Sequence, residues 1–189
     1  MTMSENVVEL DGVSRRFGKT VALDGLSLRV PRGCVYGLVG VNGAGKTTLI
    51  KHILGLLKVR SGSVRVFGLD PVRNPVAVLR RIGYLSEERD LPEWMRIDEL
   101  MRYTAAYHPN WDQAHAEELL RTFGLDVSKK VKNLSKGMRA QAGLVAAVAH
   151  RPDLLVLDEP STGLDAVIRR DILKAIIRTV ADDGRTPIF

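Results

Sequence analysis

Gly40-Val41-Asn42-Gly43-Ala44-Gly45-Lys46-Thr47-Thr48 matches the phosphate-loop pattern G-x-x-x-x-G-K-[ST]. The pattern carries this meaning only where it connects a strand to a helix. Residues 34–39, with the sequence CVYGLV, form a short apolar run that predicts a buried strand before the loop. Apolar residues then recur at helical spacing at positions 49, 50, 53, 54 and 57. Both flanks therefore predict the strand, loop and helix that the motif requires.

The residue types in this loop suit a phosphate-bearing ligand. Its glycines let the backbone turn tightly and approach a phosphate without a Cβ in the way. The N–H groups of the first helical turn and the helix dipole favour negative charge at the same point. Lys46 adds a mobile positive charge, and the Thr47 hydroxyl suits Mg²⁺. The alternative is a glycine-rich turn that carries a lysine by chance, and the correct flanks argue against it.

The length and the single cysteine bound the class of protein. A chain of 189 residues suits one domain with an attached subdomain, and it can bury roughly 70% of its unfolded surface. Disulfides are therefore not needed for stability. Cys34 lies in the apolar run before the loop, so we expect it to pack in the core, and one cysteine fits a reducing compartment.

The charge distribution and the apolar pattern indicate which classes of partner this chain can have. The net charge of +6 comes from scattered residues without interleaved aromatics, which favours a solvated surface over a nucleic-acid groove. No nucleic-acid partner is therefore expected. The N-terminus lacks the apolar core of a signal peptide, and the longest apolar stretch, residues 142–149, is far shorter than the ~20 residues of a membrane span. We expect a soluble chain that relies on another polypeptide for any membrane spans.

The first third of the chain reads as antiparallel β-structure around one helix. Residues 7–10, 21–30 and 63–68 have strand patterns. Asp11-Gly12 and Phe17-Gly18-Lys19 are predicted turns between these strands.

The rest of the chain alternates between helices and short strands. Residues 81–85 and 153–157 predict strands, and a further strand begins at Thr186. Two amphipathic helices are expected at 96–107 and 112–123, the second with Asp112 as its N-cap and Gly124 as its stop. Two more helices are expected, one over 137–149 and one with apolar residues at 168, 172, 176 and 180. Residues 88–134 thus form a helical block inserted into an α/β chain.

Two carboxylates end the apolar strand at 154–157. Ligands of open α/β sheets bind at the carboxyl ends of strands, which is where Asp158 and Glu159 stand. Asp158 can hold Mg²⁺, and Glu159 can polarise a water for attack on a γ-phosphate. Pro160 then turns the chain away. The alternative is a strand that ends in ordinary surface acids, and the phosphate loop makes it the weaker interpretation.

The ordered set of motifs resembles the ATP-binding cassette (ABC) ATPases over residues 7–189. The set comprises the Walker A loop at 40–48, the signature Leu134-Ser135-Lys136-Gly137-Met138, Walker B at 154–158 with Glu159, and the D-loop at 161–165. The signature just before Walker B is specific to this family. The resemblance implies an α/β P-loop NTPase core of the RecA-like type, with an N-terminal antiparallel β subdomain and an inserted helical subdomain. Residues 1–87 and 135–189 would form the core, and 88–134 the helical subdomain.

The resemblance also implies a site that binds ATP and Mg²⁺. Phe17 matches the aromatic that stacks on adenine, although the family usually carries tyrosine there. Ser135 and Gly137 match the residues that contact the γ-phosphate of a second subunit, and Asp165 matches the D-loop aspartate that couples two sites. The implied nucleotide contacts are Phe17, Gly40, Asn42, Gly43, Ala44, Gly45, Lys46, Thr47, Thr48, Ser135, Gly137 and Asp165. The implied catalytic residues are Glu159, Lys46 and Glu87, and the metal ligands are Thr47, Asp158 and Glu87.

Three features depart from the family pattern. Lys136 and Met138 replace a glycine and a glutamine of the usual L-S-G-G-Q signature. Glu87 stands where the Q-loop glutamine is expected and adds negative charge near the metal. The switch histidine would follow the strand at Thr186, but the sequence stops first, which we interpret as a C-terminal truncation. None of the histidines at 52, 108, 115 and 150 lies in that context.

The resemblance implies the ATPase subunit of a transporter, with exporter-type cassettes as the nearest subgroup. Two cassettes, identical or different, would hold ATP between them and dock on a transmembrane permease. The location would then be cytoplasmic, at the inner face of the cell membrane. Two alternatives stay open: a non-transport ABC ATPase that acts on ribosomes or DNA, and a nucleotide-binding structural subunit without turnover.

Overall fold

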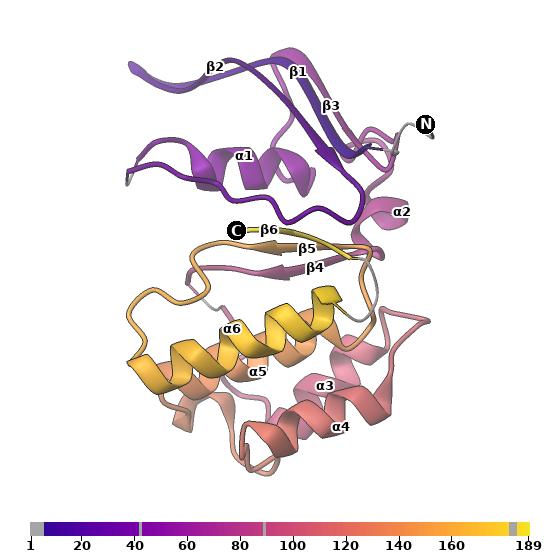
Figure 1. Ribbon diagram of the computed structural model, residues 1–189, viewed down its shortest axis with the longest axis vertical. Helices are drawn as coiled ribbons and strands as arrows, with labels where there is room; N and C mark the ends of the chain where they lie inside the picture. Colours follow the sequence, from indigo (N-terminus) through magenta and orange to yellow (C-terminus); the bar gives the residue numbers. More distant parts are fainter. Residues whose placement is uncertain (1–5, 42, 89, 182–184) are drawn as a thin grey trace.

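The computed structural model describes residues 6–41, 43–88, 90–181 and 185–189, with only the backbone described for 179–181. The elements follow the chain in layers (Figure 1). An antiparallel sheet covers helix α1, α1 lies on a parallel sheet, and α5 and α6 cover the opposite face of that sheet. Helices α3 and α4 lie beyond α5. The predicted α/β class and the β-rich first third are both confirmed.

The antiparallel sheet has the order β2-β1-β3, from β1 (Asn6–Phe17), β2 (Thr20–Pro31) and β3 (Ser61–Val66). The turn predicted at Asp11-Gly12 is wrong, because β1 runs straight through it. The pairing shifts register between Leu10 and Val13 but continues on both sides. Gly12, with φ +58°, forms an irregularity within the strand instead of reversing the chain. The turn predicted at Gly18 is confirmed as the β1–β2 hairpin.

The parallel sheet has the order β4-β5-β6, from β4 (Ile82–Leu85), β5 (Leu154–Leu157) and β6 (Thr186–Ile188). All four residues of β5 are buried, which confirms the central strand that the apolar run predicted. Its carboxyl end therefore opens at the middle of this sheet, where ligands of α/β folds bind.

The segment before the phosphate loop corrects two predictions. It forms only an isolated parallel bridge, Tyr36 to Ile188, instead of a regular strand. Its backbone hydrogen-bonds to Pro187 and Phe189, and Tyr36 and Leu38 pack against the core, whereas Val35 and Val39 are exposed. Cys34 is also exposed and does not pack in the core as we expected. The segment nevertheless delivers the chain to the phosphate loop beside the parallel sheet.

The helices are α1 (Lys46–Ile53), α2 (Pro75–Leu79), α3 (Ile97–Ala105), α4 (Gln113–Thr122), α5 (Lys136–Val148) and α6 (Ala166–Ala181), with a 3₁₀ turn η1 (Val131–Asn133). The helix after the phosphate loop and the four later helices confirm the sequence periodicity. Helix α2 and η1 were not predicted, because each is too short to show a helical period.

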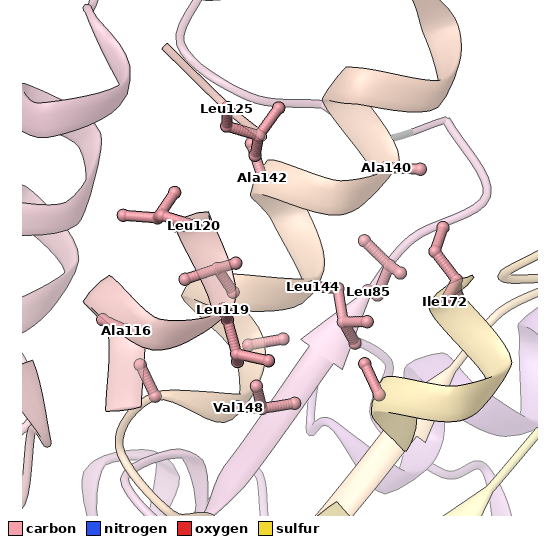
Figure 2. Close-up of a cluster of buried hydrophobic side chains, with 14 of the residues drawn as sticks. Leu85, Ala116, Leu119, Leu120, Leu125, Ala140, Ala142, Leu144, Val148 and Ile172 are labelled. Atoms are coloured by element: carbon pink, nitrogen blue, oxygen red, sulfur yellow. The ribbon is translucent and has the colours of Figure 1, made fainter. Parts of the chain in front are cut away.

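Two buried clusters divide the core. One joins the antiparallel sheet, α1 and one side of β5, and the other joins β5, α3, α4, α5 and α6. Figure 2 shows the second cluster, in which Leu119 of α4 and Leu144 of α5 are buried together with Leu85 at the end of β4. The helical block at 88–134 therefore shares its core with α5 and β5, and its boundaries stay predictions.

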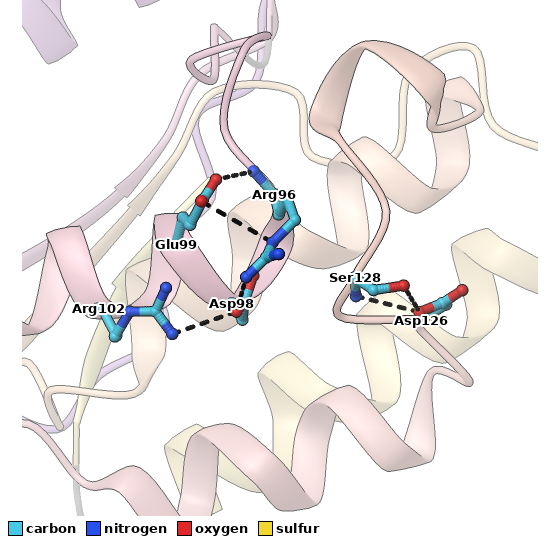
Figure 3. Close-up of polar contacts among 6 residues, drawn as sticks. All are labelled: Arg96, Asp98, Glu99, Arg102, Asp126 and Ser128. Atoms are coloured by element: carbon cyan, nitrogen blue, oxygen red, sulfur yellow. Dashed lines mark hydrogen bonds and ion pairs between the residues drawn. The ribbon is translucent and has the colours of Figure 1, made fainter.

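Charged side chains fix the start of the helical block. The backbone N–H of Arg96 donates to Glu99 at 2.8 Å, and the Arg96 guanidinium donates to both oxygens of Asp98 (Figure 3). The hydrogen bonds from the Arg96 guanidinium lower the pKa of the Asp98 carboxyl. A carboxylate in the first turn also suits the positive end of the helix dipole. Together these contacts set where α3 begins.

Candidate functional site

The phosphate loop ends at Gly45, the N-cap of α1, which has φ +90°. A Cβ at this position would collide with the Ala22 carbonyl oxygen and lie 3.1 Å from Cδ2 of Leu23. Glycine is therefore required both by the backbone conformation and by the approach of β2. No side chain caps α1, so the N–H groups of its first turn remain available for an anion.

A cavity of about 330 Å³ opens at this helix end. It is lined by Ala22, Val41, the run from Gly43 to Thr48, Glu87 and Glu159. The fold thus brings together most of the predicted phosphate contacts with two of the predicted acids. Asn42 lies outside the described residues. Gly40 contributes a carbonyl oxygen that accepts from Lys46 at 2.5 Å.

Lys46 and Glu159 meet inside this cleft. The Lys46 Nζ lies 3.3 Å from Oε1 of Glu159, and about a fifth of the Lys46 side chain is exposed. The other carboxylate oxygen, Oε2, accepts from the Thr162 hydroxyl at 2.7 Å. The Thr162 hydrogen bond and then the Lys46 contact lower the pKa of Glu159, so the carboxylate is ionised at neutral pH.

Asp158 ends β5 next to Glu159, as predicted. Its side chain is only 4% exposed, and its N–H donates to the Leu85 carbonyl at 2.9 Å. Asp158 lines a second cavity of about 330 Å³ together with Lys46 and Glu159. The two acids and the phosphate-loop lysine therefore share one region at the carboxyl end of the parallel sheet.

This arrangement fits a nucleoside triphosphate with Mg²⁺. The uncapped helix end and Lys46 suit phosphate oxygens. Thr47 is exposed and lines the cavity, and Glu87 lines it as well. Hydroxyl and carboxylate oxygens of this kind are the protein ligands that Mg²⁺ takes beside phosphate. The metal roles of Thr47, Asp158 and Glu87 stay predictions.

Phe17 is at the end of β1, before the hairpin turn. Its ring is 47% exposed, and the Arg15 guanidinium lies 4.8 Å from the ring centroid. Phe17 is not among the residues that line the two cavities around Lys46. The hairpin tip and the phosphate loop lie on the same side of the molecule in Figure 1. Stacking of Phe17 on adenine stays a prediction.

The signature residues begin helix α5. The Ser135 hydroxyl accepts from the Met138 N–H at 3.2 Å, and Ser135 is exposed. A Cβ on Gly137 would lie 3.2 Å from two Ile168 carbons, so α5 and α6 approach closely there. Neither Ser135 nor Gly137 lines the phosphate-loop cavity of its own chain. Their contact with a second subunit stays a prediction.

The D-loop aspartate caps the next helix. Asp165 Oδ1 accepts from the N–H groups of Val167 and Ile168, each at 3.0 Å, at the start of α6. The coupling role of this exposed residue stays a prediction.

The histidines lie away from the phosphate-loop cavity. None of them lines the phosphate-loop cavity in the part of the chain that the structure describes. The rings of His108 and His150 stack with centroids 3.7 Å apart, between the helical block and the end of α5.

Sequence reasoning missed two residues of the site. Ala22 closes the cavity from β2 through its main chain, and no sequence pattern marks such a contact. Thr162 contacts Glu159, and its position three residues later, after a proline, is the signal of a β-turn that could have indicated it.

The comparison with protein families decides the membership of this chain. The family model described as ABC transporter matches residues 23–162, which include the phosphate loop, the signature and both acids. The chain belongs to the ABC transporter family. This confirms the resemblance that the motifs indicated.

Relatives within the ABC transporter family match nearly the whole chain. The daunorubicin resistance ATP-binding protein DrrA3 of Streptomyces coeruleorubidus is 39% identical over 99% of this chain and 60% of its own length. The bacitracin transport ATP-binding protein BcrA of Enterococcus faecalis is 31% identical over 100% of this chain and 62% of its own length. The chain thus spans about three fifths of these ABC relatives.

A solved structure confirms the ABC ATPase fold. The structure of an ATP-binding subunit of an ABC transporter aligns with a TM-score of 0.85 and 30% identity, over 96% of this chain and 78% of that one. Among the described residues of this ABC family member, no helix has both the length and the apolar character that crossing a bilayer needs.

Proposed function

We propose that this chain binds and hydrolyses ATP to power an ABC transporter, through a dimer that holds nucleotide between two cassettes. The observation that carries this proposal is the meeting of Lys46 and Glu159 in one cleft at the uncapped end of α1. The fold thereby supplies a phosphate cradle, a positive charge and an ionised carboxylate within one cavity. Family membership adds support for ATP as the nucleotide.

Each group of site residues has a different role in the proposed hydrolysis. The main chain of the phosphate loop and Lys46 bind and orient the triphosphate. Glu159 accepts the proton of the water whose oxygen bonds to the γ-phosphorus, while the bond to the bridging oxygen of ADP breaks. Thr47, Asp158 and Glu87 would hold Mg²⁺, which when bound neutralises charge on the phosphates.

The partner is proposed to be a transmembrane permease, with the chain on the cytoplasmic side of the membrane. A groove of about 920 Å³ is lined by residues of α2, β4, α3 and α5, and by exposed Val76 and Tyr107. Glu88 and Asp90 of the Glu87 loop also line this groove. A partner docked there would touch the loop that reaches the phosphate cavity. The relatives named for daunorubicin resistance and bacitracin transport support an exporter of small molecules.

Glu159→Gln tests this proposal in the natural full-length protein. Loss of the base is expected to slow ATP hydrolysis by roughly 10² to 10⁴, while MgATP still binds. Glu117→Gln, which removes an exposed carboxylate on α4, is the matched control and should keep the wild-type rate. Hydrolysis by Glu159→Gln at the wild-type rate would contradict the proposed role of Glu159.

A further inference from the structure

The loop after β5 holds Glu159 in an uncommon backbone conformation. Glu159 has φ +48°, a left-handed value that is unfavourable for a residue with a side chain. Such conformations persist where the surrounding structure fixes them, and they gather at functional sites. The contacts that fix Glu159 therefore bear on the chemistry of the cleft.

A β-turn brings Thr162 back onto Glu159. The Thr162 N–H donates to the Glu159 carbonyl at 3.2 Å, which closes a four-residue turn with Pro160 at its second position. The turn returns the Thr162 side chain to the glutamate, and its hydroxyl donates to Oε2 at 2.7 Å. Thr162 therefore contacts Glu159 twice, once at the backbone carbonyl and once at the carboxylate.

The two carboxylate oxygens of Glu159 consequently have different surroundings. Oε2 accepts from Thr162, whereas Oε1 faces the Lys46 ammonium at 3.3 Å. Rotation of the carboxylate would break the short Thr162 bond, so Oε1 is kept toward the phosphate-loop cavity. A base must hold such an orientation to accept a proton from a water in the cleft.

We propose that Thr162 is a positioning residue for ATP hydrolysis, because its hydroxyl anchors Oε2 of Glu159 and leaves Oε1 to act as the base. This inference rests on the proposed function, since it assigns a device that orients the base of that reaction. In this role Thr162 influences the reaction through Glu159. The hydroxyl, not the size of the side chain, carries the effect.

Thr162→Val and Thr162→Ser separate the hydroxyl from the shape of the side chain. In the natural full-length protein, valine is expected to lower kcat roughly 10-fold, the size of one charge-assisted hydrogen bond, with little change in KM for ATP. Serine is expected to recover most of the rate.

A double variant distinguishes this inference from the proposed function. With Glu159→Gln already present, Thr162→Val should slow hydrolysis no further, because the carboxylate that it positions is gone. Wild-type kcat in Thr162→Val, beside a slow Glu159→Gln, would overturn the positioning role alone. A Glu159→Gln variant as fast as wild type would instead overturn the assignment of the base.

Discussion

Lys46 and Glu159 form an ion pair across the phosphate-loop cleft, with Nζ 3.3 Å from Oε1, although they are far apart in the sequence. Lys46 follows the loop after the Tyr36 segment, and Glu159 follows β5. A phosphate group bound by Lys46 would compete with Glu159 for the ammonium charge. Binding of a nucleotide at Lys46 would therefore weaken this ion pair and release the carboxylate that we propose as the base.

Gly45→Ala should destabilise the chain more than the same substitution at a glycine in an open turn. Alanine at 45 would adopt φ +90° and collide with the Ala22 carbonyl, so a loss of about 2–4 kcal/mol in the free energy of unfolding is expected. Gly18→Ala is the matched control, because φ is +57° there but nothing lies within 4 Å of the added Cβ. Denaturant unfolding measures both, and equal losses would contradict the steric account.

Asp112 should stabilise α4 mainly as its N-cap. Its Oδ1 accepts from the His115 N–H at 2.9 Å, and its Oδ2 pairs with Arg151 at 3.0 Å. Asp112→Ala is expected to lower the free energy of unfolding by about 1 kcal/mol, and Asp112→Asn by less, because asparagine keeps the cap. Urea unfolding at neutral pH tests the order. Asparagine as costly as alanine would assign the effect to the ion pair.

The buried His150 should make the protein less stable in acid. Burial, and then the neighbouring His108, lower the pKa of His150 to about 4. The unfolded chain binds a proton below pH ~6.5, whereas the folded chain does so only near 4, so stability falls as the pH drops between these values. The loss attributable to this group is of the order of 3 kcal/mol.

His150→Asn provides the measurement for this prediction. The variant also loses the contact of His150 Nε2 with the Ile82 carbonyl, so its absolute stability is not the readout. The slope of the unfolding free energy against pH, between 6.5 and 4, should be smaller in the variant than in the wild type. Parallel slopes would show that His150 does not carry the acid sensitivity.

Local signals predicted much of the fold and the polar ends of its elements. The alternation and apolar runs predict the strands, and the sequence predicts Asp112 as the N-cap that its bond to His115 confirms. Asp158 and Glu159 were placed at the end of a central strand because an all-apolar run predicts burial on both faces. These features depend on residues close together in the sequence.

The predictions that were wrong concern residues whose conformation or burial is set by segments far away in the sequence, against the preference of the local residue types. Asp11-Gly12 has turn residues, but pairing of β1 with both β2 and β3 keeps the strand extended. Cys34 lies in an apolar run, yet this run bridges to β6 at Tyr36 instead of forming a regular strand, and Cys34 is exposed. The ion pair of Lys46 with Glu159 joins two motifs that were each recognised, but its geometry needed the assembled sheet.

Binding of MgATP to Lys46→Ala tests most directly whether the phosphate loop holds the nucleotide. Titration calorimetry on the natural full-length protein should show affinity lower by roughly 10- to 100-fold, because a charge-assisted contact with phosphate is lost. Lys51→Ala, an exposed lysine of the same helix, is the matched control and should bind as the wild type does. Unchanged affinity in Lys46→Ala would contradict the nucleotide site.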